Sequence, residues 1–196
     1  MRLYFIFFFL IIFKSFGQEV SEINKALGIS DSLEYQQEIR IYKNSIGNNT
    51  VIFRMYKEKN NWLGEISYYD SRLKQITKIN GIVFPKEKIG KLKPVDPELI
   101  WLKILMTNVE FLPNIKDISY KFGTPKIEFE KGEPTIVTKK RLVVDGEGYD
   151  VYIRNRKTKN SFYFDNPKTY LKYYPTVDEL ISYNELLSVL EKEFSF

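Results

Sequence analysis

Residues 141–175 read RLVVDGEGYDVYIRNRKTKNSFYFDNPKTYLKYYP. Two turn sequences, Asp145–Gly148 and Lys157–Asn160, separate three short runs that are rich in Val, Ile, Tyr and Phe. Short runs of this composition between turns are typical of an antiparallel meander. After Asn166 and Pro167 we expect the chain to leave the sheet and to enter a final helix. We therefore expect the domain to be organised around this meander.

Further strands are predicted upstream of the meander. Residues 34–70 predict three strands, because apolar and polar residues alternate there as they do in a sheet with one buried face. Residues 71–79 predict a fourth strand, which ends at the tight-turn sequence Asn80-Gly81 and is followed by a short apolar run. Residues 126–131 and 135–144 are predicted to complete the sheet.

Helices are predicted from apolar spacing and from capping residues. The clearest one has Asp96 as its N-cap and Pro97 at its first position, and it should continue to Pro113. Because its apolar residues surround the helix, we expect burial on more than one side. The other predicted helices cover residues 19–29, 114–122 and 178–194.

These elements predict an α+β fold with antiparallel meander sheets of about six to eight strands, packed by the central helix and the C-terminal helix. Residues 85–97 are rich in proline and lysine. Proline fixes φ and removes a backbone donor, so this segment is expected to be a connector without regular structure. Its two sides are too short to be separate domains, and we expect a single domain over residues 18–196.

Residues 1–17 are expected to form a secretory signal peptide. Arg2 supplies a positive charge, an apolar run follows from Leu3 to Phe13, and small residues stand at Ser15 and Gly17, so cleavage is expected before Gln18. The apolar run of eleven residues is shorter than the about 20 that a membrane-spanning helix needs. We therefore predict export to the periplasm or beyond, with no transmembrane segment in the mature chain.

The composition excludes several classes of catalytic and metal site. The chain has no His and no Cys, so it cannot form Ser-His-Asp or Cys-His nucleophiles, or zinc, haem and iron–sulfur sites that use those ligands. It also lacks the glycine motifs that bind phosphates and dinucleotides. No cofactor or metal is predicted. Lysines far outnumber arginines, which is atypical of proteins that recognise phosphate, so nucleic acid is not expected as a partner.

A basic and aromatic set of residues is the first candidate binding site. Tyr152, Arg154 and Arg156 are predicted to share one face of the central meander strand, and Lys157 and Lys159 extend the positive charge in the following turn. Such a face could bind an anionic glycan, a lipid headgroup or an acidic protein. The ordinary alternative is a solvated sheet face.

A second candidate is a group of tyrosines, which could stack on sugars or dock a protein. We expect them instead to cover the edge of the sheet with a short helical turn, since Tyr is well suited to partial burial. The group consists of Tyr163, Tyr170, Tyr173 and Tyr174.

Carboxylates offer the third candidate, because a general acid and a base can together hydrolyse a glycosidic bond. The candidates are Glu128 and Glu130 on one strand face, and the cluster Asp145, Glu147 and Asp150. The ordinary interpretations are a solvated strand face and a tight turn. The cluster also lacks the residue pattern of a calcium loop.

Three functions follow as hypotheses from these observations. We expect a non-catalytic exported domain that binds a macromolecule of the envelope or another secreted protein. One alternative is a carboxylate-dependent hydrolase that acts on a glycan. The other is an inhibitor or immunity-type protein directed against a secreted toxin or enzyme.

Overall fold

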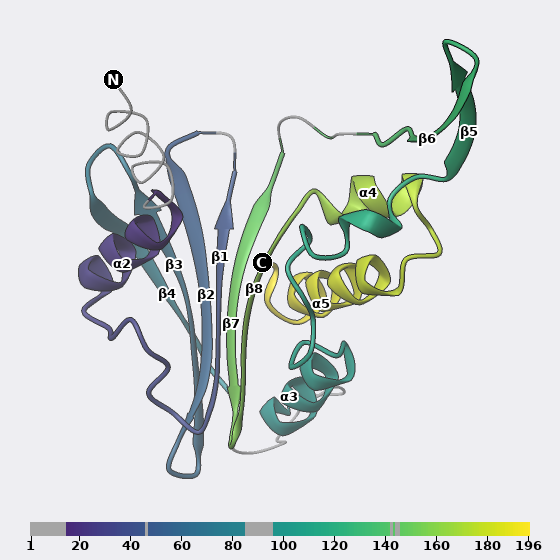
Figure 1. Ribbon diagram of the computed structural model, residues 1–196. Helices are drawn as coiled ribbons and strands as arrows, with labels where there is room; N and C mark the ends of the chain where they lie inside the picture. Colours follow the sequence, from purple (N-terminus) through teal and green to yellow (C-terminus); the bar gives the residue numbers. More distant parts are fainter. Residues whose placement is uncertain (1–14, 46, 85–95, 142, 144–145) are drawn as a thin grey trace.

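A six-stranded antiparallel sheet forms the centre of the computed structural model, which describes residues 15–45, 47–84, 96–141, 143 and 146–196. The strand order is β4-β3-β2-β1-β7-β8, and β1 pairs with both β2 and β7 (Figure 1). A separate two-stranded sheet is formed by β5 and β6. The strands are β1 Gln37–Asn44, β2 Asn49–Glu58, β3 Asn61–Asp70, β4 Gln75–Ile82, β5 Pro125–Glu130, β6 Glu133–Thr138, β7 Gly148–Asn155 and β8 Thr158–Asp165.

Helices cover both faces of the large sheet. One helix, α2, lies on one face, and α3, α4 and α5 lie on the other (Figure 1). The fold is therefore α+β with an antiparallel sheet, as predicted. The helices are α2 Ser15–Leu27, α3 Pro97–Met106, the 3₁₀ turn η1 Ser119–Lys121, α4 Pro167–Tyr173 and α5 Asp178–Phe194.

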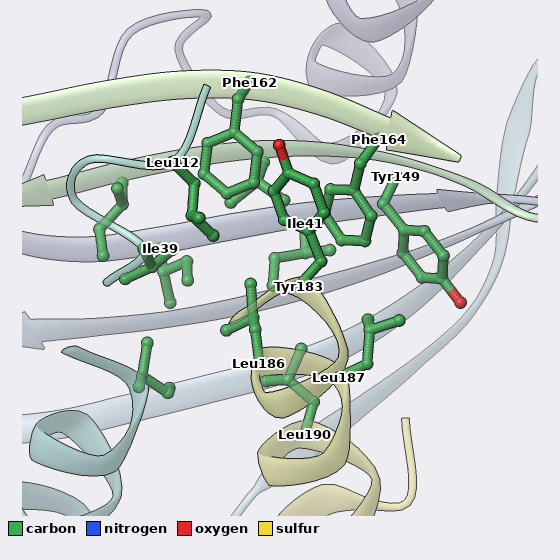
Figure 2. Close-up of a cluster of buried hydrophobic side chains, with 14 of the residues drawn as sticks. Ile39, Ile41, Leu112, Tyr149, Phe162, Phe164, Tyr183, Leu186, Leu187 and Leu190 are labelled. Atoms are coloured by element: carbon green, nitrogen blue, oxygen red, sulfur yellow. The ribbon is translucent and has the colours of Figure 1, made fainter. Parts of the chain in front are cut away.

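The main core lies between the sheet and α5. Phe164 of β8 stacks on Tyr183 of α5, with ring centroids 4.6 Å apart and planes 3° from parallel. The Tyr183 hydroxyl donates a hydrogen bond to the carbonyl of Pro113, which ties the segment after α3 to this helix. Figure 2 shows the surrounding side chains, which include Ile39, Ile41, Leu112, Tyr149, Phe162, Leu186, Leu187 and Leu190.

The other face of β1 is buried as well, although the sequence pattern predicts only one buried face. Glu38 and Arg40 are 0% and 1% exposed. The Glu38 carboxylate accepts hydrogen bonds from Nε of Arg40 at 2.7 Å and from Nε of Arg54 at 3.0 Å. Its second oxygen accepts the amides of Glu34 and Tyr35. This polar cluster holds residues 28–36 against the sheet.

The predicted turn at Asn80-Gly81 is wrong, because β4 runs through it. The turn lies earlier, where the Asp70 side chain accepts the amides of Arg72 and Leu73 at 2.9 and 3.1 Å. These local hydrogen bonds fix the turn. The Asn-Gly pair then falls in an exposed edge strand, which tolerates glycine.

The strands predicted over 126–131 and 135–144 do not join the large sheet. They form the β5–β6 hairpin, whose turn residues Lys131 and Gly132 have φ of 52° and 88°. The edge of β8 is already occupied, because the Ile115 amide donates to the Tyr163 carbonyl and the Tyr163 amide donates to the Asn114 side chain, both at 2.9 Å. The predicted first meander strand is also absent among its described residues, 141 and 143.

The central helix begins as predicted, with the Asp96 carboxylate accepting the amides of Glu98 and Leu99. It ends at Met106 rather than near Pro113, and Asn108 follows with φ of 59°. Burial on more than one side is also wrong: one side is buried, and the other exposes an apolar stripe. That stripe consists of Leu99, Leu102 and Met106.

Several predictions concern the chain ends and connections. The helix predicted over 114–122 is reduced to η1, whereas the C-terminal helix is confirmed as α5. Most of the signal segment and of the 85–97 connector lies outside the described residues, and the expected cleavage point before Gln18 lies in the first turn of α2. Among the helices that the structure describes, none is long and apolar enough to cross a membrane.

Candidate functional site

The candidate site is the side of β7 and β8 that points away from α3, α4 and α5, called here the β7–β8 face. Strand alternation creates it, because Val151, Phe162 and Phe164 turn into the core while their neighbours turn outward. The two strands pair with Tyr152 opposite Ser161. The outward side chains are Asp150, Tyr152 and Arg154 from β7 and Lys159, Ser161, Tyr163 and Asp165 from β8.

The β7–β8 face is open because the covering elements lie over the other strands. Helix α2 packs on the β1–β4 half of the sheet, where Ile23 joins Tyr42, Ile52 and Tyr69 in a buried cluster. Tyr152 stands at the rim of that cluster and meets the Tyr42 ring edge-on, with centroids 5.8 Å apart. Beyond Tyr152 the outward side chains are half-buried or exposed.

The basic end of the face holds a pocket of about 400 Å³. Tyr152, Lys159 and Ser161 line it from the strands. Asp31, Ser32 and Leu33 close it from the segment that Glu38 and Arg40 anchor, so the pocket also holds one carboxylate. The pocket therefore depends on the buried polar cluster beneath it.

The acidic end holds a pocket of about 440 Å³ next along β8. Asp150, Tyr163 and Asp165 line it together with Asn114, Lys116 and Asp117. Gly148 makes room for the Tyr163 ring, since a Cβ there would lie 2.6 Å from the Tyr163 hydroxyl oxygen. Because Asp150 pairs with Tyr163, Asp165 is its diagonal neighbour, and such pairs lie roughly 7–8 Å apart.

Partial burial raises the pKa of three side chains at the acidic end and so favours their protonated forms. Burial, followed by the nearby charge of Glu19, raises the pKa of Asp150 to about 6. Burial also raises the pKa of Asp165. Burial, and then the charges of Asp165 and Asp150, raise the pKa of Tyr163 to about 12. A ligand that supplies positive charge or hydrogen-bond donors would offset the cost of burying the ionised carboxylates.

Asp150→Asn should therefore stabilise the fold near neutral pH, by about 1–2 kcal/mol, since water at the pocket mouth screens part of the charge. The pKa of Asp150, about 6, lies above its ordinary value of 3.8, so the folded state holds the proton more tightly. The stability that the protonated Asp150 contributes is complete below pH 3.8 and is lost as the pH rises through about 6. Urea unfolding should give equal stabilities in acid and a more stable variant near neutral pH. A variant less stable than the wild type near neutral pH would contradict this.

The predicted basic site is only partly assembled. Tyr152, Arg154 and Lys159 lie on the β7–β8 face, but Arg156 and Lys157 form the two-residue turn beyond the end of β7 at Asn155. The expectation that Arg156 shares the strand face is therefore wrong. Its φ of 55° belongs to the turn.

Arg154 also has a packing role. Its Nη1 donates to the carbonyl of Leu33 at 3.4 Å, and so it helps to hold the segment that covers β1. Lys159, by contrast, is exposed on the β7–β8 face and lines the basic pocket.

The predicted carboxylates are dispersed. Glu128 and Glu130 are exposed on the separate hairpin, as their solvated-face interpretation predicts. Glu147 pairs with Lys43 at 2.9 Å and accepts a hydrogen bond from Tyr149, which packs on the α5 side of the sheet, whereas Asp150 lies on the other side. Asp145 lies outside the described residues. Among the described residues no group of three His, Cys, Asp or Glu side chains could hold a metal ion.

The tyrosine group divides between packing and the candidate site. Tyr170 and Tyr174 stack on Phe122, with centroids 5.2 and 4.9 Å apart, as the predicted structural role requires. Tyr163 instead lines the acidic pocket.

Asp165 is the site residue that the sequence interpretation missed. The turn was expected at 157–160, whereas it lies at residues 156 and 157. A two-residue turn there would have placed Tyr163 opposite Asp150 and Asp165 on the same face. Comparisons with protein-family models, with curated proteins and with solved structures find no match for this chain.

Proposed function

We propose that this protein is a non-catalytic exported domain that binds another exported protein through the β7–β8 face. The observation that carries the proposal is the pair of neighbouring pockets on the open β7–β8 face, which are lined by charged and tyrosine side chains. Export is inferred from the signal sequence in residues 1–17.

The distribution of charge favours a polypeptide segment as the ligand. At one end of the face Lys159 and Arg154 outnumber Asp31. At the other end Asp117, Asp150 and Asp165 outnumber Lys116. An extended peptide with an acidic and a basic residue would complement both ends. A uniformly anionic glycan or nucleic acid would be repelled by the carboxylates. A secreted enzyme or toxin as this partner corresponds to the inhibitor or immunity-type hypothesis.

Lys159→Glu tests this proposal, because it reverses an exposed charge that lines the basic pocket. The new glutamate should repel the acidic residue of a bound partner, and capture of that partner from native envelope extract should fall by at least about tenfold. Lys192→Glu, an exposed position on α5, is the matched control and should capture as the wild type does. Mass spectrometry of the captured proteins provides the measurement. Equal capture by both variants would contradict the proposal.

A carboxylate-dependent hydrolase is the second candidate, and one specific observation favours it. Asp150 and Asp165 line one pocket, and glycoside hydrolysis needs two carboxyl groups facing one substrate. The raised pKa of Asp150, about 6, suits a general acid. If this candidate is correct, the purified protein should release reducing ends from an envelope glycan. The Asp165→Asn variant should release none, because both carboxyl groups are needed.

A further inference from the structure

The outward side chains of β8 repeat with the period of an extended chain. Lys159, Ser161, Tyr163 and Asp165 follow one another at every second residue, which spaces them by about 6.8 Å. Alternate side chains of an extended segment that lies along β8 have the same spacing, whereas successive turns of a helix are about 5.4 Å apart. Over the three steps from Lys159 to Asp165 a bound helix would therefore fall about 4 Å out of register.

The charges at the two ends of the β7–β8 face are available to a ligand. Among the described residues, Lys159 and Asp150 have no salt-bridge partner, and Asp150 accepts its hydrogen bond from the uncharged Asn44 side chain at 3.3 Å. Arg156 and Lys157 add positive charge in the turn beyond the basic end. The charge of Glu19 acts on Asp150 and so adds to the negative end.

The two ends recognise charge separately. Lys159 precedes Tyr163, the partner of Asp150 in the pairing register, by four residues and Asp165 by six, so the ends are about 14–20 Å apart. This distance exceeds the Debye length of about 8 Å at physiological ionic strength. Each end therefore responds to the ligand charge that lies against it, and a ligand of uniform charge is repelled at one end.

We propose that the β7–β8 face binds an extended segment of its partner in which an acidic and a basic residue stand four or six positions apart. This inference rests on the proposed function and adds the sequence pattern of the ligand. The acidic residue faces Lys159, and the basic residue enters the pocket that Asp150 and Asp165 line. The spacing is even because alternate side chains of an extended chain point to the same side.

Selection of displayed random peptides on the purified protein tests this pattern. The wild type should enrich peptides that carry an acidic and a basic residue four or six positions apart. Lys159→Glu makes both ends acidic and should instead enrich peptides with a basic residue at both positions. Lys159 is exposed, so circular dichroism should be unchanged. Lys192→Glu, exposed on α5, is the matched control and should enrich the wild-type pattern.

Fluorescence anisotropy with a labelled peptide from the wild-type selection gives a second readout. The peptide should bind Lys159→Glu at least about tenfold more weakly than it binds the wild type or Lys192→Glu. The same peptide with its two charged residues moved next to each other should lose at least about as much, because it can then satisfy one end of the face only.

Enrichment of peptides with one sign of charge, enrichment of charges at odd spacing, or the same pattern from Lys159→Glu would overturn the inference. Failure to enrich any peptide would overturn it as well. If Lys159→Glu still loses the partner that the wild type captures from envelope extract, the face binds a protein through another kind of surface and the proposed function stands. If capture by Lys159→Glu equals that by Lys192→Glu, the proposed function fails too.

Discussion

Glu38→Ala is expected to lower the free energy of unfolding by about 3–5 kcal/mol, because it removes the fully buried carboxylate that Arg40 and Arg54 share. The Glu38 carboxylate lies 2.7 Å from Nε of Arg40 and 3.0 Å from Nε of Arg54. It also satisfies the amides of Glu34 and Tyr35 at 2.7 and 3.0 Å. Equilibrium unfolding in urea, compared with the wild type, measures the loss.

The matched control is Glu34→Ala. Its carboxylate lies 3.6 Å from the same Arg54 but is 49% exposed, so the expected loss is about 0–1 kcal/mol. A similar loss for both variants would show that the buried cluster has no special role.

The same cluster predicts sensitivity to acid. Burial by itself raises the pKa of Glu38, but the Tyr35 amide and the Arg40 and Arg54 side chains outweigh it and lower the pKa below the ordinary value of 4.5. Its contribution to stability is therefore complete above that value and is lost as pH falls through the lowered pKa. The wild type should lose stability in this range more steeply than Glu38→Ala does.

Phe164→Ala is expected to cost about 3–5 kcal/mol, the usual effect of removing a fully buried ring. Phe164 is 0% exposed and packs between Tyr149 and Tyr183, at centroid distances of 4.9 and 4.6 Å. Because Tyr163 and Asp165 flank it in β8, the cavity should also disturb the acidic pocket on the opposite side of the strand.

Phe111→Ala provides the control for this prediction, since the same ring is removed from a side chain that is 76% exposed. A change within about 0.5 kcal/mol is expected there. If the two substitutions had equal effects in thermal or urea unfolding, the stacked core between β8 and α5 would not be the main packing contact of that strand.

Local patterns predict most of the fold. Alternation in residues 34–70 predicts β1, β2 and β3, and the Asp96-Pro97 pair predicts the start of α3. Both signals depend on neighbouring residues alone, and nothing elsewhere in the chain competes with them. The Asn80-Gly81 turn is also a local signal, but the Asp70 side chain stabilises a competing turn nearby, and the prediction is wrong.

Long-range contacts explain what the sequence alone cannot predict. Nothing near Glu38 indicates that residues 28–36 fold back over it, and the pattern there resembles an ordinary solvated face. Pairing of Ile115 with the edge of β8 excludes the β5–β6 hairpin from the large sheet, which leaves Phe129 exposed. For the candidate site, Asp150 and Lys159 were predicted, whereas Asp165 depended on the position of one turn.

The central claim is that the β7–β8 face contacts a protein partner in the exported state. Photo-crosslinking in the native host tests it directly, with a photoreactive amino acid at Ser161, which is exposed and lines the basic pocket. Ser188, exposed on α5, is the control position. A discrete protein adduct at position 161 and none at position 188 is the predicted result. No adduct at 161, or the same adducts at both positions, would contradict the account.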